Sequence, residues 1–227
     1  MAAGNPTQAW NRLVERLTDG PGVAFPEKFS VLDHLLYGIV QEGASPSPSL
    51  EAYKNLVNGF FNFNEMRVAH SGEIVALLEG IPDAPAKAQR MLEILRFVFD
   101  TSYGFDLETM KKKPVKQAQK QLSKVTGATR FAVAATVQRA LGGITPAVDD
   151  AGRELLVACG VANAEDSLDT VLAQLETLLT EENAAGVCLR LQEAAYDPAQ
   201  RAALTDGPAS SNGKKKPVKK TTKRAAT

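Results

Sequence analysis

A pair of neighbouring carboxylates, Asp149 and Asp150, follows a long stretch of positive charge. From Thr109 to Val148 the sequence has eight basic residues and no acidic one: Lys111, Lys112, Lys113, Lys116, Lys120, Lys124, Arg130 and Arg139. Lysine and arginine gathered in this way attract phosphates. A carboxylate beside such a surface can stabilise positive charge on a sugar or activate a water molecule. The alternative for the basic stretch is a solvated helix face, and for Asp149 a helix N-cap.

The residues before Asp149 indicate two helices joined by a tight turn. An amphipathic stretch that includes Leu122 runs up to a tight break at Thr126-Gly127-Ala128-Thr129, and a second apolar helix is expected from about Arg130 to Leu141. Such a turn points backbone N–H groups outward, and the start of the second helix adds partial positive charge. We therefore expect a phosphate-binding hairpin made of Thr126, Gly127, Ala128, Thr129 and Arg130. An ordinary helix–helix turn is the alternative.

This arrangement resembles the helix-hairpin-helix of the endonuclease III-like superfamily of DNA glycosylases. The hairpin of that family usually reads Leu-Pro-Gly-Val-Gly and is followed by a Val-Asp pair that carries the catalytic aspartate. Gly127 matches the first hairpin glycine, and Asp149, after Val148, lies 22 residues further on (149 − 127). The resemblance covers roughly residues 30 to 160. It implies that Asp149 is a catalytic carboxylate that assists cleavage of an N-glycosidic bond.

Three hairpin positions depart from the family pattern. Thr126 replaces the proline, Thr129 replaces the second glycine, and Phe131 replaces the catalytic lysine of the bifunctional members. A β-branched residue tolerates positive φ poorly, so Thr129 predicts a reshaped hairpin or weaker phosphate binding. Without the lysine amine no Schiff base forms, and strand cleavage by that route is not expected. Phe131 is then a core residue or a pocket wall that stacks on an extruded base.

Four further side chains are candidates for facing DNA: Gln41, Lys120, Lys124 and Phe131. In the family, residues near the position of Gln41 approach the minor groove, and a polar side chain there could fill the space left by an extruded base. A solvent-facing glutamine at a helix end is the alternative for Gln41.

The sequence offers no cofactor site. Cys159 and Cys188 are its only cysteines, so it lacks the four closely spaced cysteines that hold an iron–sulfur cluster in many members of the resembled family. We expect both to be small core residues. His34 and His70 have no metal-ligand spacing, and no metal is expected.

Composition predicts an all-α chain. Hydrophobic residues make up 44%, aromatic residues only 6%, and no alternating strand pattern persists. Ser30 with Asp33 predicts a capping box, and residues 43–49 (GASPSPS) predict a loop, with Ser49 capping the next helix.

By analogy with the family we expect two helical lobes and a disordered basic tail. Residues 25–144 would form a helical barrel lobe containing the helix-hairpin-helix (116–141). Residues 145–206 would form the second lobe, joined by an N-terminal helix within residues 1–24. Residues 207–227 would be disordered.

The net charge of zero hides a segregation. Residues 208–227 have seven basic residues and no acid, so the rest has a net charge of −7 (19 basic, 26 acidic). The tail is expected to bind phosphates without sequence preference, or alternatively to aid solubility or localisation. Its basic residues are Lys214, Lys215, Lys216, Lys219, Lys220, Lys223 and Arg224.

The leading hypothesis is a monofunctional DNA glycosylase that uses Asp149, binds damaged or mismatched double-stranded DNA as a monomer, and needs no cofactor. The alternatives are a non-catalytic DNA-binding descendant in which Asp149 only caps a helix, and a helical module whose acidic body meets a basic protein partner. No apolar run approaches the roughly 18 residues of a membrane span, and the first residues lack a signal-peptide core. We therefore expect a cytoplasmic, nucleoid-associated protein, or a nuclear one in a eukaryote.

Overall fold

The structure is a computed structural model that describes residues 6–24, 26 and 28–205. The predicted basic tail, with all seven of its lysine and arginine residues, lies outside the described residues.

Within the described residues every regular element is a helix, which confirms the all-α prediction. The helices are α1 (Pro6–Asp19), α2 (Val31–Gln41), α3 (Pro46–Asn58), α4 (Phe63–Val68), α5 (Ser71–Leu77), α6 (Ala84–Ser102), the 3-10 helix η1 (Glu108–Lys112), α7 (Val115–Leu122), α8 (Arg130–Leu141), α9 (Asp150–Ala158), α10 (Leu168–Leu178), α11 (Ala184–Tyr196) and α12 (Pro198–Thr205).

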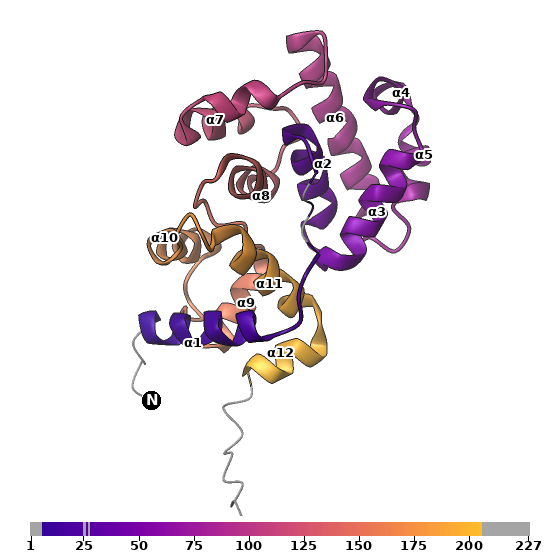
Figure 1. Ribbon diagram of the computed structural model, residues 1–227. Coiled ribbons are helices and arrows are strands. Elements are labelled where there is room, and N and C mark those ends of the chain that lie inside the picture. Colours follow the sequence, from indigo (N-terminus) through magenta and orange to yellow (C-terminus); the bar gives the residue numbers. More distant parts are fainter. Residues whose placement is uncertain (1–5, 25, 27, 206–227) are drawn as a thin grey trace, which may run out of the picture.

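These helices surround two separate hydrophobic cores. In Figure 1, α2 to α8 form one group, while α1 lies beside α9 to α12, so the two ends of the described chain share a lobe. The first core is built mainly from α2, α3, α6 and α8, with fully buried side chains such as Leu35 and Leu95. The second joins Trp10 and Leu13 of α1 to Leu155 and Leu191 of α9 and α11. Burial of these apolar faces is the main stabilising contribution.

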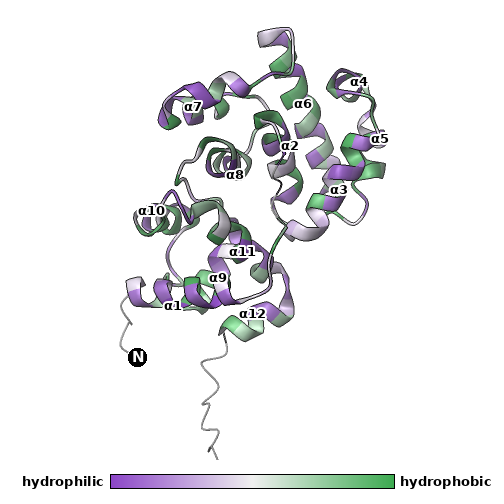
Figure 2. Cartoon of the chain, in the orientation of Figure 1, coloured by the Kyte–Doolittle hydropathy of each residue, from purple (hydrophilic) through white to green (hydrophobic). Residues whose placement is uncertain are grey.

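The hairpin helix α8 packs closely along α2. A Cβ atom at Gly38 of α2 would lie 2.7 Å from Cα of Ala132 in α8, too close for any side chain. Glycine at this position therefore lets the two backbones approach. Figure 2 shows the contrast within the hairpin, where α7 is mostly hydrophilic while α8 has apolar residues all along it.

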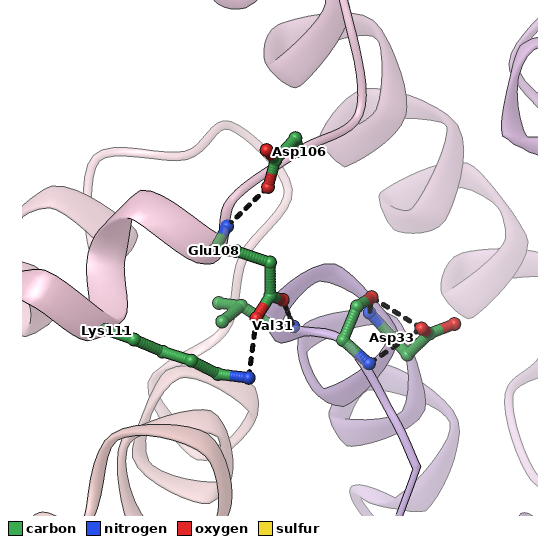
Figure 3. A network of polar contacts seen from close by, with 6 residues as sticks. Val31, Asp33, Asp106, Glu108 and Lys111 are labelled. Atoms are coloured by element: carbon green, nitrogen blue, oxygen red, sulfur yellow. Dashed lines mark hydrogen bonds and ion pairs between the residues drawn. The ribbon is translucent and has the colours of Figure 1, made fainter.

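Polar contacts tie the start of α2 to the segment that leads into the hairpin (Figure 3). Ser30 and Asp33 form the predicted capping box. The backbone N–H of Val31 donates to Oε1 of Glu108 at 2.7 Å, and Lys111 pairs with the same carboxylate. A negative charge at a helix N-terminus complements its partial positive charge, so Glu108 stabilises α2 and fixes the approach to α7.

The prediction of a loop over residues 43–49 is wrong in its second half. The helix α3 begins at Pro46, and Ser49 is buried inside it with its hydroxyl donating to the carbonyl of Ser45 at 2.7 Å. Proline is tolerated in the first helical turn, because the N–H it lacks would have no partner there.

Candidate active site and DNA-binding hairpin

The turn of the hairpin packs directly on α6. Gly127 has φ +88°, and a Cβ atom there would lie 2.5 Å from the carbonyl oxygen of Arg90 and 2.9 Å from Cβ of Glu93. Any other residue would meet both backbone strain and a collision. Gly127 thus fixes the position of the turn against the first lobe.

Thr129 fits the hairpin without strain. Its φ is −92° and its ψ 160°, and its hydroxyl accepts a hydrogen bond from the N–H of Ala132 at 3.1 Å, so it is the N-cap of α8. The turn therefore needs no positive φ at this position. The amides of Gly127, Thr129 and Arg130 donate to no acceptor among the described residues. These N–H groups are available to a phosphate.

The side chains predicted to face DNA from α7 are exposed. Lys120 lies on that helix, Lys124 lies in the turn after it, and both are solvent-accessible, as is Thr126. Arg130 is exposed too, but its guanidinium forms an ion pair with Asp169 of α10. Exposed pairs of this kind contribute little stability, so a phosphate can compete with Asp169 for Arg130.

Asp149 is the N-cap of α9 and is only 9% exposed. Its Oδ1 accepts from the N–H of Gly152 at 3.0 Å. Its Oδ2 accepts from the Tyr196 hydroxyl at 2.8 Å, the Gly43 N–H at 3.1 Å and Nε2 of Gln192 at 3.4 Å. The pKa of Tyr196 lies well above its ordinary value, mainly because the hydroxyl is buried and secondly because of the negative charge of Asp149. The hydroxyl therefore keeps its proton and donates it in the hydrogen bond to Asp149. Both lobes therefore position this carboxylate.

A cavity of about 220 Å³ opens beside Asp149. The hairpin helix supplies Arg130 and Phe131 to its wall, and α11 supplies Tyr196. Phe131 is 4% exposed and packs on Ala134, Ala135 and Ala147, so it is both a core residue and a cavity wall. The remaining lining residues are Glu42, Gly43, Pro146, Val148, Asp150, Leu168 and Leu172.

A second cavity of about 390 Å³ shares Arg130, Pro146 and Leu172 with the first. Its lining also includes Ala128 and Thr129 of the hairpin and the acidic residues Asp169 and Glu176 of α10. Arg130 thus lines both cavities.

Gln41 does not face DNA or solvent, and that prediction is wrong. It is 0% exposed. Its Nε2 donates to Oε1 of Gln192 at 2.6 Å, and its Oε1 accepts from Nη1 of Arg139 at 2.6 Å. The guanidinium of Arg139 also lies over the Tyr37 ring, 5.3 Å from its centroid. The end of α2 is enclosed by α8 and α11, so this amide serves the junction between the lobes.

The residue that the sequence interpretation missed is Glu42, next to Gln41. It is the C-cap of α2, it is partly buried, and it lines the Asp149 cavity. Burial raises the pKa of Glu42, against the opposing effects of the Thr129 hydroxyl and Arg90. Lys87 of α6 lies nearby and donates to the carbonyl of Val40 at 2.8 Å, and burial lowers its pKa to about 8. The expected helix end pointed to this part of the sequence, but it did not show that Glu42, rather than Gln41, lines the cavity beside Asp149.

The cysteines do not fit an iron–sulfur cluster, which needs four thiolate ligands. Cys188 is buried in α11, where its sulfur accepts from Nε2 of Gln138 at 3.3 Å, and Cys159 is half-buried at the end of α9. Among the described residues no group of three or more His, Cys, Asp or Glu could hold a metal ion. No helix in the same part of the chain is long and apolar enough to cross a membrane.

Comparison with solved structures identifies the fold. No protein-family model matches the sequence, and neither does any curated protein. A non-covalent endonuclease III–DNA complex has a TM-score of 0.63 at 18% identity, covering 83% of this chain and 85% of that one. A thermostable thymine-DNA glycosylase gives 0.62 at 16%, covering 84% and 86%. The 3-methyladenine DNA glycosylase of H. pylori bound to 1,N6-ethenoadenine gives 0.59 at 15%, covering 88% and 96%. This chain therefore has the fold of the endonuclease III-like DNA glycosylases.

Proposed function

We propose that this protein binds double-stranded DNA and removes a damaged or mismatched base as a monofunctional glycosylase, with Asp149 as the catalytic carboxylate. One observation carries the proposal: Asp149 shares a cavity with Arg130 and Phe131 of the hairpin helix. A nucleotide rotated out of a duplex bound at the hairpin would enter that cavity.

The hairpin would bind the DNA backbone. The free amides at Gly127, Thr129 and Arg130 and the start of α8 would bind a phosphate, and Lys120 and Lys124 would add charge nearby. Contacts of this kind position a protein on any duplex without reading its sequence. The seven basic residues of the tail would strengthen such binding.

The hydrogen bonds of Asp149 favour an electrostatic role. The Gly43 N–H and the Tyr196 hydroxyl occupy both lone-pair sites of Oδ2, and the Gly152 N–H occupies one site of Oδ1. These donors hold the carboxylate in place, and its negative charge can stabilise the positive charge that grows on the sugar as the C1′–N bond breaks. Phe131 cannot form a Schiff base, so we expect no strand cleavage. We also expect no iron–sulfur cluster or other cofactor.

The same hydrogen bonds favour a second candidate function, a DNA-binding protein in which Asp149 only caps α9 and joins the lobes. An Asp149→Asn variant separates the two. For a glycosylase we expect single-turnover base release to fall by about 100-fold or more, while binding to a duplex with an abasic-site analogue is kept. Asp150→Asn, which removes the adjacent charge, is the matched control, and thermal unfolding checks that both variants fold.

Two results would contradict the glycosylase. One is a wild-type protein that releases no base from any duplex in a broad lesion panel while still binding DNA, which would leave the second candidate. The other is absence of duplex binding even at low salt, which would remove both and favour a protein-interaction module. We expect the protein to act as a monomer and to be found with chromosomal DNA, in the nucleoid or in a nucleus.

A further inference from the structure

We propose that Glu42 is a second catalytic carboxyl group of this site, the acid that gives a proton to the departing base. The inference rests on the proposed function and extends it to a residue to which no sequence motif points.

The end of α2 places Glu42 beside Asp149. Gly43, with φ +73°, turns the chain so that its N–H donates to Oδ2 of Asp149 at 3.1 Å. Glu42, one residue earlier, lines the same cavity. The backbone of this turn thus holds both carboxyl groups at one site.

The two carboxyl groups have different surroundings. Asp149 accepts hydrogen bonds from the N–H groups of Gly152 and Gly43 and from the Tyr196 hydroxyl. Glu42 faces the Thr129 hydroxyl of the hairpin, Arg90 and Lys87 of α6, and Asp149. Burial has the largest effect and raises the pKa of Glu42; the Thr129 hydroxyl and Arg90 oppose it, Asp149 adds a smaller upward effect, and Lys87 a still smaller downward one. Two carboxyl groups in unlike environments are the usual arrangement for an acid and its charged partner.

The proposed step is balanced. The proton of the Glu42 carboxyl moves to a ring nitrogen of the base, the C1′–N bond breaks, and its electron pair stays with the base. The positive charge left at C1′ faces Asp149. Water then forms a bond to C1′ and gives a proton to the Glu42 carboxylate, which restores the acid. The sum is addition of water across the glycosidic bond.

This role predicts that the need for Glu42 depends on the leaving base. A neutral base leaves as an anion unless it is protonated, whereas a base that already carries positive charge, such as 7-methylguanine, leaves without help. A residue that only shapes the cavity or adds charge to it would affect both kinds of base alike.

The experiment measures single-turnover base release from duplexes with 7-methylguanine and from duplexes with neutral lesions (uracil, hypoxanthine, 8-oxoguanine and 1,N6-ethenoadenine). We expect Glu42→Gln to slow release of the neutral bases by about 100-fold and to leave 7-methylguanine release within about threefold. The rate at which the wild type releases a neutral base should fall as the pH rises through the pKa of Glu42. This fall in rate should be missing from the pH profile of Glu42→Gln. Asp150→Asn removes another carboxylate from the same cavity and should not discriminate between the two kinds of base.

Each other outcome overturns the inference. If Glu42→Gln slows all bases equally, or if the wild type releases only 7-methylguanine, Glu42 is not the acid and the glycosylase proposal stands. If the wild type releases only neutral bases, the pH profile decides. A rate that still falls with rising pH in Glu42→Gln would show that Glu42 is not the acid. If the wild type releases no base, the proposed function and this inference fail together.

Discussion

The hairpin and the junction between the lobes show two ways in which residues of this chain cooperate. In the hairpin, the N-cap hydroxyl of Thr129 and the N–H of Ala132 are three positions apart. At the junction, Gln41 binds Arg139 and Gln192, which are 98 and 151 positions away. The first arrangement is local and is visible in a short window of sequence. The second exists only after α2, α8 and α11 have packed together.

The end of α2 makes the contrast sharpest. Gln41 points into the junction and is fully buried, while Glu42 faces the cavity and the hairpin. A helix turns about 100° per residue, so neighbouring side chains look in different directions. Which of the two lines the cavity was decided by the helices that pack around this end.

The largest expected effect tests the fit of the hairpin turn. Gly127→Ala should lower the free energy of unfolding by about 4 kcal/mol, because positive φ and a backbone collision act together. Gly142→Ala is the matched control: that glycine also has positive φ, at 68°, but has open space around it, so about 1 kcal/mol is expected. Urea denaturation measures both. Equal losses would show that the turn is not pressed against α6.

The next effect tests the junction. Gln41→Leu should cost about 3 kcal/mol, because Arg139 and Gln192 lose a buried partner. Gln117→Leu, on the exposed surface of α7, should change stability by less than about 0.5 kcal/mol. A double-mutant cycle with Arg139→Leu should give a clear coupling energy. If the losses of the two single variants simply add up in the double variant, the coupling energy between Gln41 and Arg139 is zero and the expected interaction is contradicted.

A third effect follows from His34 in α2. Burial lowers the pKa of His34 to about 4, and the positive charge of Arg139 is the next largest cause. Between pH 6.5 and about 4, the unfolded chain binds a proton at this histidine that the folded protein does not, so stability falls as the pH falls. His34 should contribute up to about 1.4 kcal/mol per pH unit to that slope. His34→Leu should flatten the profile in this window. Parallel profiles for the two proteins would contradict a buried neutral histidine.

The smallest effect tests the N-cap hydrogen bond of Thr129. Thr129→Ala removes the N-cap and should cost about 1 kcal/mol, whereas Thr129→Gly, which restores the glycine usual in the resembled family, should cost only a few tenths. Thr129→Ser keeps the cap and should match the wild type. Chemical denaturation resolves these differences if the three variants are measured together. A loss for the serine variant as large as for alanine would contradict the capping role.

Several features could be predicted because they depend on neighbours in sequence. The capping box at Ser30, the helix from Arg130 to Leu141 and the helix that begins after Asp149 all match the structure. The start of α3 was missed because two prolines within GASPSPS suggested a loop, although a helix accepts proline in its first turn. The position of Glu42 in the cavity was missed because no local pattern marks a side chain whose partners lie on α6 and in the hairpin.

The sequence by itself determined that the chain is all-α, that a glycine turn joins two helices, and that Asp149 stands where it could cap the helix beyond them. These properties follow from local conformational preference, capping and hydrophobic period. The tertiary structure alone decided that Gln41 is buried, that Tyr196 and Gly43 hold Asp149 from separate elements, and that Glu42 shares its cavity. Those contacts join residues more than 40 positions apart, and their partners are set by the packing of the two lobes.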